Sequence, residues 1–473
     1  MSVSPQDIGI RAAVHLLNRL GFGPRPGQAR AILSGGLDRW VREQLEPGAD
    51  PELETRLSRL STLAYPLSQT VALYASEDQR GLGQVIDEFN TAKVIRAVHG
   101  RNQLQEVLVD FWFNHFNVYI ADGFARPATP SYERDAIRPH VLGRFRDLLG
   151  ATARHPAMVY YLDNYLNTVA RSVGGGRIVG GINENYGREL MELHTVGVDA
   201  GYTQADVVDA ARCFTGWGID NLRSSGSFVY RPVAHDTGAK SVFGLTLPAG
   251  GGQEDGERLL DHLSRHPATA RFVSRKLAQR LVADEPAGSI VDRAAQTFLA
   301  TDGDIAEVVK AIVGSPEFWA EAFAPVKPKV PAEFVFSALR AADAEVSASR
   351  GLSASLQAMG QPLYFCIPPT GYSNRGDDWT NPSSHLARMN FALDLAAGAV
   401  AGVAVDARSA VRKAGGSAED AKSAAAALSA DLFGRGLSSE TAGALSRVAP
   451  AGSPSVAARV LGLTLASPEM QAR

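Results

Sequence analysis

The chain has little cysteine: only Cys213 and Cys366 occur among its 473 residues. Two thiols permit at most one disulfide bond, so a fold built on a disulfide framework is excluded. No cysteines have the short spacing that is typical of a structural zinc site. The hydrophobic content of 45% and the charged content of 21% are ordinary for a soluble globular protein.

The sequence also lacks a long apolar run and a strong charge bias. The most apolar segment, residues 391–405, is short, rich in Ala and Gly, and contains Asp394, so no transmembrane segment is expected. The first residues lack a basic region followed by an apolar core, and they therefore indicate no signal peptide. The formal net charge of −3 gives no reason to expect nucleic acid as a partner. The expectation is a soluble, cytoplasmic protein.

Helical periodicity dominates the rest of the chain and predicts an all-α fold. We expect a large multi-helix globular domain with long irregular loops and at most a small β-hairpin, at residues 228–244. Residues 1–345 are predicted to form the main helical domain that carries the site. Residues 346–473 are predicted to supply a cover loop and C-terminal helices packed on it. Residues 50–80 are interpreted as an irregular arm, and the glycine-rich residues 171–181 as a loop.

The densest run of side chains able to do chemistry lies in residues 181–218, which we expect to form two helices. At about 100° per residue, Asn185, Glu189 and Glu192 fall within about 60° of one another on the first helix. Two carboxylates at i and i+3 repel unless a cation, a proton or a metal shares them. Arg188 can supply part of that positive charge. The pattern fits a buried and well-paired polar helix, a metal or acid/base site, or a surface charge pattern.

A second polar stripe lies in the aromatic helix LVDFWFNHFNVYI, where Asp110, Asn114 and Asn117 recur at helical spacing. Buried polar groups need partners, so we expect this stripe to face the carboxylate helix. His115 lies on the aromatic face of the same helix. It is interpreted either as a satisfied core histidine or as a ligand or proton-transfer residue. His194 lies nearly opposite the carboxylates and can join them only if their helix ends there.

Three further segments hold candidate residues. Arg138 either holds an anion that faces the site or belongs to an ion-paired surface. His235, at the turn of the expected hairpin, is either a ligand or part of a local turn. Residues 360–384 form a long stretch dense in Pro, Gly, Tyr and Trp, and long irregular loops in compact proteins are often functional. We expect this loop to cover the site, with Tyr372, Asp377, Asp378 or Trp379 near substrate; the alternative is a purely structural cover.

Several of these segments together resemble the DUF1800 family of bacterial proteins, a domain of unknown function. The resemblance rests on DFWFNHFNV at 110–118, NENYGRELMELHTVGVDAGYTQADVVDAARCFTGW at 183–217, HDTGAKSVFG at 235–244 and MGQPLYFCIPPTGY at 359–372. Gly187 and Asn167 depart from the residues usual in the family. The resemblance implies a mostly helical protein that is often encoded beside a sulfatase-like companion. Many relatives are exported, and the family implies no reaction.

The sequence predicts an enzyme with a buried carboxylate and histidine site, either a metal-dependent hydrolase or an oxidoreductase. The residues expected to act are as follows: catalytic Glu189, Glu192, His115 and Arg188; metal-ligating His115, Glu189, Glu192 and His194; substrate-binding Asn114, Asn185, Arg138, His235, Tyr372 and Trp379. Imidazoles with carboxylates suit Zn²⁺, Fe²⁺ or Mn²⁺. Haem is a further option, because histidines and aromatic residues are frequent in the predicted helices.

Two alternatives stay open at this point. Two carboxylates without a metal can divide the acid and base roles if their environments separate their pKa values, as glycan or peptide-derivative hydrolysis requires. The rival interpretation is a non-enzymatic binding or scaffold protein. Such a protein would present a polymeric or anionic ligand to a partner enzyme.

Overall fold

The structure is a computed structural model that describes residues 5–76, 80–173, 177–320, 322, 327–448 and 456–473. The described chain is mostly helical, with short two-stranded sheets only, which confirms the predicted fold class. None of the helices in these ranges is both long and apolar enough to cross a membrane.

Helices occur throughout the described part of the chain. Those that precede residue 216 are α1 (Pro5–Arg19), α2 (Gln28–Gly35), α3 (Leu37–Leu45), α4 (Pro51–Leu57), α5 (Leu67–Ala75), α6 (Arg80–His99), α7 (Gln103–His115), α8 (Ala125–Ser131), η1 (Tyr132–Ile137), η2 (Arg138–His140), α9 (Phe145–Arg154), α10 (Pro156–Tyr161), η3 (Asn164–Leu166), α11 (Asn185–Glu189), η4 (Leu190–His194), η5 (Val198–Ala200) and α12 (Gln204–Cys213). Those that follow are η6 (Pro232–Ala234), α13 (Glu254–Ser264), α14 (Pro267–Leu281), α15 (Gly288–Ala300), α16 (Ile305–Val313), α17 (Pro316–Ala320), α18 (Pro331–Ala341), α19 (Arg350–Ala358), η7 (Asp377–Trp379), α20 (Pro382–Ala396), α21 (Ala407–Lys413), α22 (Ala421–Phe433), α23 (Ser439–Val448), α24 (Val456–Leu465) and α25 (Pro468–Gln471).

The strands form four antiparallel pairs in the described part of the chain. They are β1 (Thr168–Val173) with β2 (Arg177–Gly181), β3 (Trp217–Ile219) with β4 (Phe228–Tyr230), β5 (Lys240–Val242) with β6 (Leu245–Leu247), and β7 (Glu345–Val346) with β8 (Val403–Ala404). The sequence predicted a single hairpin at 228–244, and its strands instead pair with neighbours on either side. Residues 171–173 and 177–181, predicted as a loop, belong to the strands β1 and β2. Residues 174–176 of the predicted loop lie outside the described ranges.

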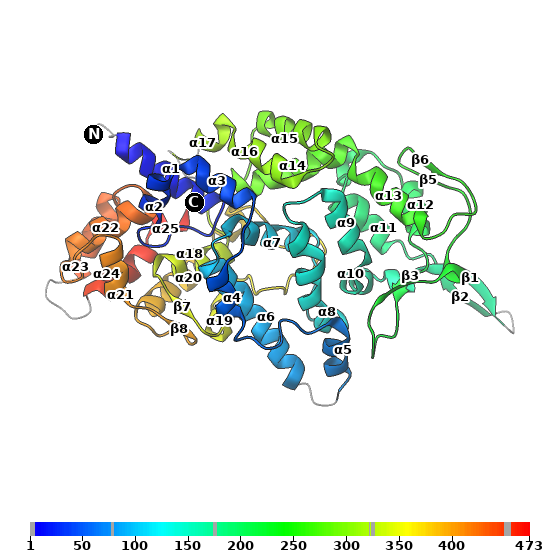
Figure 1. Ribbon diagram of the computed structural model, residues 1–473, viewed down its shortest axis with the longest axis horizontal. Helices are drawn as coiled ribbons and strands as arrows, with labels where there is room; N and C mark the ends of the chain where they lie inside the picture. Colours follow the sequence, from blue (N-terminus) through cyan, green and yellow to red (C-terminus); the bar gives the residue numbers. More distant parts are fainter. Residues whose placement is uncertain (1–4, 77–79, 174–176, 321, 323–326, 449–455) are drawn as a thin grey trace.

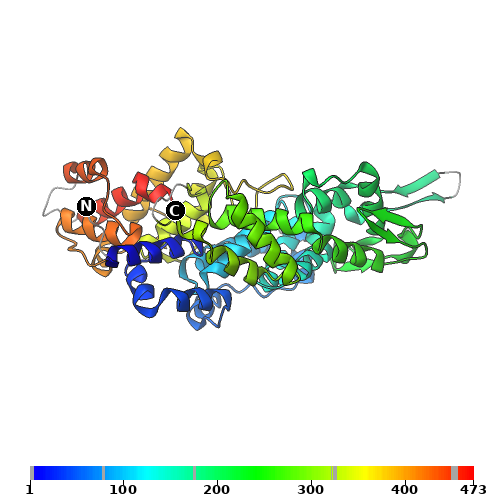
Figure 2. The same ribbon diagram turned by 90° about the horizontal axis from the view of Figure 1, so that it is seen from above.

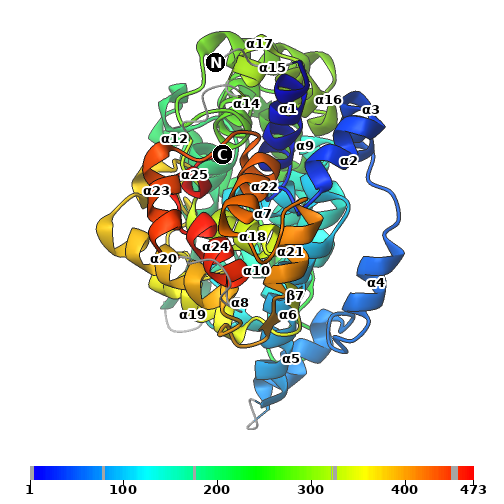
Figure 3. The same ribbon diagram turned by 90° about the vertical axis from the view of Figure 1, so that its left-hand side faces the viewer.

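The molecule is elongated, with the C-terminal helices at one end and the β1–β2 pair projecting from the other (Figures 1 and 2). Helix α1 packs against α22, so the beginning and the end of the chain share one end of the molecule. Helices α4 and α5 lie along the outside, beside α6 (Figure 3). The prediction of an irregular arm at 50–80 was therefore wrong, because both helices occur in it and pack on α6.

One hydrophobic cluster runs through both halves of the chain. It includes Trp112 of α7 and Leu395 of α20, both fully buried. The β7–β8 pair joins residues 345–346 to residues 403–404, across the predicted boundary at 345. The division into residues 1–345 and 346–473 stays a prediction.

Candidate functional site

The polar stripe of α7 faces the long loop of residues 360–384. The Asn114 amide donates to the carbonyl of Tyr372 at 2.7 Å and accepts from the Tyr372 backbone N–H at 2.6 Å. The Asn117 amide donates to the carbonyls of Cys366 and Pro368, each at 2.9 Å. These hydrogen bonds hold the loop backbone at Cys366, Pro368 and Tyr372 against α7. They correct the interpretation that the stripe faces the carboxylate helix.

The loop closes a small chamber of about 40 Å³ over α7. Asp110, Lys93 and Arg280 line the chamber, and Asp110 lies 3.3 Å from the Lys93 ammonium and 3.2 Å from the Arg280 guanidinium. Tyr364 lines it too and adopts a left-handed backbone conformation with φ of 63°, which costs a non-glycine residue energy and often occurs at functional sites. This volume holds a few water molecules.

The aromatic side chains of the loop are held by its own backbone. The Tyr372 hydroxyl donates to the Pro362 carbonyl at 2.9 Å, and the Trp379 indole donates to the Ser373 carbonyl at 3.1 Å. The two rings meet edge to face, 5.8 Å between centroids. Tyr372 lines the chamber. Both residues are partly exposed, and their predicted contact with substrate stays a prediction.

Arg138 is bound by two carboxylates. Its guanidinium donates to both oxygens of Glu106, at 2.6 and 3.0 Å, and to Glu133 at 3.2 Å. The two carboxylates raise the pKa of Arg138 despite its burial. In this arrangement the charge of Arg138 is already matched, so an incoming anion would have to compete with both acids.

The carboxylate helix is shorter than predicted and changes pitch after Glu189. Helix α11 ends at Glu189, and η4, a π-helix, carries Glu192 and His194. Short π-helical segments often occur at functional sites. Asn167 fixes the start of this unit: its amide donates to the Ala211 carbonyl at 2.8 Å and accepts from the Asn183 N–H at 3.0 Å.

The two residues that depart from the family pattern both lie at this junction. A Cβ on Gly187 would stand 2.7 Å from the backbone nitrogen of Ala211, so α11 and α12 touch there through their backbones. Asn167 bonds to the same residue of α12. The capping box formed by Thr203 and Asp206 starts α12. The carboxylates therefore rest on a tightly packed helix pair.

Glu189 and Glu192 carry the unusual electrostatics of this unit. Burial, together with the neighbouring Glu192 carboxylate, raises the pKa of Glu189, and Arg188 opposes that rise. Arg188 lies 3.6 Å from Glu192 and 2.8 Å from Glu184. Glu189 remains partly exposed. Glu189 thus holds its proton more tightly than an ordinary glutamate, and its neighbour Glu192 is paired with Arg188.

Two phenols accompany the carboxylates. Burial and the hydrogen bond to Glu192 raise the pKa of Tyr202 to about 12. Tyr161, at the end of α10, donates its hydroxyl to the Ile367 carbonyl at 2.5 Å. Burial is the main cause that raises the pKa of Tyr161, and the charge of Glu189 adds a smaller contribution in the same direction. Tyr161 thus holds the long loop at Ile367. Asn185, at the start of α11, is partly exposed.

His115 and His194 meet on the other face of α7. The Nε2 atom of His115 lies 3.1 Å from the His194 carbonyl, and the two rings are 6.2 Å apart between centroids. Because a carbonyl only accepts, Nε2 carries the proton and Nδ1 is the basic nitrogen. His115 Nδ1 and His194 Nε2 are buried without a hydrogen-bond partner. Burial lowers the pKa of both, to about 3 for His194.

Lys276 of α14 lies beside these histidines. Its positive charge lowers the pKa of His115 and of His194. Its ammonium stands 5.3 Å from the centroid of the Phe272 ring. No carboxylate among residues that the structure describes pairs with it, and burial lowers its pKa to about 8. A cation is thus held among aromatic and imidazole rings without a counter-charge.

Replacing Lys276 with methionine is expected to raise the free energy of unfolding at pH 7 by about 1–2 kcal/mol, discounted for the partial exposure of this side chain. The lysine binds its proton more weakly in the folded than in the unfolded chain, whose ordinary pKa is 10.5. Wild-type stability should therefore rise between pH 8 and 10.5, and the gain in the variant should shrink there. Urea denaturation at pH 7 and 9.5 measures both. Lys310→Met, at an exposed ion pair, should change little at either pH.

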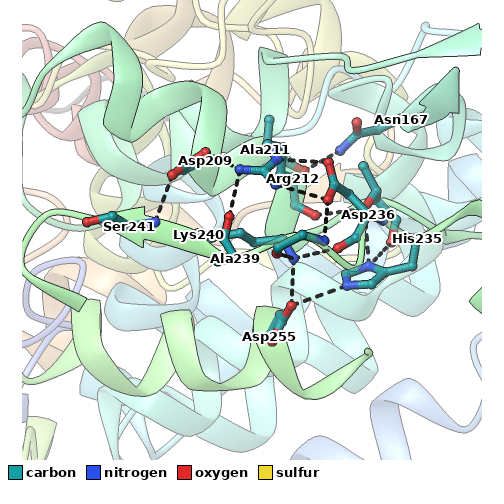
Figure 4. A network of polar contacts seen from close by, with 12 residues as sticks. Asn167, Asp209, Ala211, Arg212, His235, Asp236, Ala239, Lys240, Ser241 and Asp255 are labelled. Carbon is teal, nitrogen blue, oxygen red and sulfur yellow. Dashed lines mark hydrogen bonds and ion pairs between the residues drawn. The ribbon is translucent and has the colours of Figure 1, made fainter. Parts of the chain in front are cut away.

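His235 lies inside a separate polar network between α12, β5 and α13 (Figure 4). Its Nδ1 atom lies 2.8 Å from the Thr215 carbonyl, and its Nε2 lies 3.3 Å from Asp255. Lys240 donates to Asp255 at 2.7 Å and to the Asp236 carbonyl at 2.5 Å. All these contacts are within the protein. They bind the loop before β5 to α13, and the predicted role of His235 at a substrate stays a prediction.

A family model described as "Protein of unknown function (DUF1800)" matches residues 15–472 of this chain. The chain belongs to the DUF1800 family. No curated protein and no solved structure matches it. The region shared with DUF1800 includes every residue of the carboxylate unit, of the α7 helix and of the long loop.

The predicted metal ligands of this DUF1800 protein are divided between two environments. His115 and His194 are buried, whereas Glu189 and Glu192 are partly exposed. In the described ranges, no three His, Cys, Asp or Glu residues are grouped so that they could hold a metal ion. The two cysteines are buried and free. A transition-metal site and a haem site therefore stay predictions.

Several DUF1800 residues that complete the site have no local signal in the sequence. Tyr161, Tyr202 and Lys276 come from α10, from the loop before α12 and from α14. These three side chains belong to the site only because of how their helices and loops pack, and the sequence near each residue does not specify that packing. The sequence favours a solvated face for Lys276, together with Arg271 and Arg275. The available signal to the contrary was Phe272, one turn before Lys276.

Proposed function

We propose that this protein is a hydrolytic enzyme in which Glu189 transfers the proton and Glu192 is the charged partner. The observation that supports it is the raised pKa of Glu189 beside a second carboxylate. Carboxyl pairs whose environments separate their proton affinities are typical of acid–base catalysis. The partial exposure of both side chains gives a substrate access to them.

Glu189 and Glu192 have different roles in the proposed reaction. Protonated Glu189 would give its proton to the leaving oxygen of the bond that breaks, and it would recover a proton from the attacking water. Glu192 would stay charged, paired with Arg188, and would stabilise positive charge that develops on the reacting carbon. These roles fit hydrolysis of a glycosidic bond, which uses two carboxyl groups.

The surroundings favour a glycan or another polar, partly apolar substrate. Tyr161 is partly exposed beside the loop, where Phe365 and Ile367 are 43% and 65% exposed. Aromatic and aliphatic surface of this kind can cover the apolar face of a sugar ring while carboxylates bind its hydroxyls. Glycans are therefore the first substrate class to test.

The pair can be tested with two isosteric variants. Glu189→Gln is expected to lower turnover by about 10²-fold, because it removes the proton donor. Glu192→Gln removes one of the causes that raise the pKa of Glu189, so the alkaline limb of the pH–rate profile should move to lower pH. Reducing-end release from a panel of polysaccharides and aryl glycosides measures both, with Glu440→Gln on an exposed helix as the matched control.

A second readout does not require the substrate. Infrared difference titration of wild type against Glu189→Gln reports the protonation of that carboxyl directly. A carboxyl that titrates above its ordinary 4.5, and lower again in Glu192→Gln, supports the proposal. A carboxyl that titrates at or below its ordinary value would refute it. Elemental analysis of wild type and of Glu189→Ala tests the metal-dependent version: a transition metal lost in the variant would assign Glu189 to a ligand role.

The second candidate is a binding protein without turnover. The exposed Phe365 and Ile367 side chains favour it, because contiguous exposed apolar groups are common at binding surfaces. Such a protein would hold a polymeric or anionic ligand for a partner enzyme, of which a sulfatase-like companion is the first to test. Polysaccharide binding that is equal in wild type and Glu189→Gln, with no product formed, would favour this candidate.

A further inference from the structure

Arg96, on α6, has a guanidinium without an acid partner. Among the described residues, no carboxylate lies within ion-pair distance of it, and none accepts a hydrogen bond from its guanidinium. Arg96 is only partly exposed. Burial lowers its pKa, and the neighbouring Arg138 lowers it further, while Glu106 and Glu133 act in the opposite direction. The charge of Arg96 is therefore incompletely compensated.

The nearby carboxylates are already shared by other cations. Four cations and four carboxylates alternate in one chain of ion pairs, in the order Glu106, Arg138, Glu133, Lys93, Asp110, Arg280, Glu333 and Arg473. Their charges cancel within the chain. Arg96 stands beside this chain as one additional positive charge. A partly buried charge without an acid partner has a desolvation cost, which a counter-ion would offset.

A small pocket lies at Arg96. Its walls come from α6, α8, η1, η2 and the segment before α5. They include Arg134, Arg138, Thr62 and Leu63. Arg134 donates to the Leu63 carbonyl at 3.0 Å, which fixes that segment over the pocket. Glu133 is also in the wall, but its carboxylate accepts from the Tyr364 hydroxyl at 2.6 Å and from Arg138 at 3.2 Å. The pocket has a volume of about 20 Å³.

We propose that this pocket binds a small monoanion, either chloride or the carboxylate head of an organic acid, against the Arg96 guanidinium. Its volume suits one or two water-sized groups and is too small for a phosphate ester. Guanidinium donors match a carboxylate in two parallel hydrogen bonds. Arg138 and Arg134 in the wall are paired with carboxylates, so among the described wall residues the charge of Arg96 is the one left for an anion. Glu133 is already paired with Arg138 and Lys93, which disfavours a cation. The sequence leaves open whether Arg138 holds an anion or belongs to an ion-paired surface. In the structure Arg138 is paired with two carboxylates, and the anion falls to the neighbouring Arg96.

The experiment compares anions of different size at constant ionic strength. Thermal unfolding of the full chain is followed in sodium gluconate, with chloride or formate replacing gluconate stepwise. Wild type should show a saturable rise in Tm of about 2 °C with chloride, with formate or with both. Saturation by chloride identifies a halide site, and saturation by formate alone identifies a carboxylate site. Equal curves for all three anions would overturn the proposal.

Arg96→Gln supplies the matched test. The variant removes the surplus cation, so in gluconate it should be at least as stable as wild type, and its response to chloride and formate should disappear. Arg39→Gln, at an exposed pair with Glu43, should keep the full response. An unchanged anion response in Arg96→Gln would overturn the proposal. Where chloride saturates the response, bromide-soaked crystals of wild type give an independent readout: an anomalous peak at Arg96 supports the halide site, and peaks confined to the surface refute it.

Discussion

Replacing Glu333 with glutamine is expected to lower the free energy of unfolding at pH 7 by about 5 kcal/mol, at the upper end for a broken buried ion pair. Glu333 is 2% exposed and pairs with the guanidinium groups of Arg280 and Arg473. Its charge also acts on Lys327 and Lys329, whose burial lowers their pKa values to about 8 and about 7. The amide keeps the shape of the carboxylate and leaves these cations without their shared counter-charge.

The measurement is the midpoint of urea-induced unfolding, followed by circular dichroism. Glu307→Gln is the matched control, because its pair with Lys310 is solvent-exposed and should contribute less than about 1 kcal/mol. Burial alone would raise the pKa of Glu333, but Arg280 and Arg473 hold it below its ordinary 4.5. The stability from Glu333 is therefore present above pH 4.5 and is lost as pH falls further. Equal losses for Glu333→Gln and Glu307→Gln would contradict this account.

The helices could be predicted because their signals are local. Thr203 and Asp206 have the spacing of a capping box in the sequence, and α12 starts there. The aromatic face of α7 also holds His115 as predicted, with the Trp112 and Phe111 rings 5.3 and 6.2 Å from its ring. Apolar periodicity and capping both act within a few residues, so a single sequence contains them. Which element packs against each helix face depends on contacts between distant residues, and local signals do not specify it.

The parts of the site that could not be predicted depend on contacts over long separations. The eight residues of the ion-pair chain, from Glu106 to Arg473, come from seven elements or segments, and charge spacing along any one helix does not specify these partners. Pitch was a second obstacle. The predicted positions of Glu192 and His194 assume α-helical rotation up to His194, whereas the π-helix that begins at Leu190 changes the rotation per residue.

The glycine-rich strand pair shows why composition misleads where pairing decides. Glycine frequency between residues 171 and 181 predicted a loop, because glycine lacks the side chain that packs in a strand. The backbone groups there nevertheless pair in a ladder, with Arg171 opposite Val179 and Thr168 opposite Gly181. Pairing with a chain neighbour satisfies those groups whatever the side chains are. The consequence for the site is that Asn183 and α11 begin directly after a defined strand.

Replacing Asp255 with asparagine is expected to lower the free energy of unfolding by about 3–4 kcal/mol, because it leaves a buried ammonium without its counter-charge. Asp255 lies 2.7 Å from Lys240 and 3.3 Å from His235, and the side chains of all three are at most 2% exposed (Figure 4). Asp236→Asn in the same network is the matched comparison. Its pair with Arg212 is more than 20% exposed on each side, so its loss should be nearer about 1 kcal/mol.

A double variant separates charge from shape in this network. If the loss in Asp255→Asn arises from the unpaired ammonium, then adding Lys240→Met should recover part of it, since no buried charge is left uncompensated. The double variant should therefore be more stable than the sum of the single effects by about 2 kcal/mol, within the range of coupled neighbours. Strict additivity would show instead that the packing and hydrogen bonds of Asp255, and not its charge, bind the loop before β5 to α13.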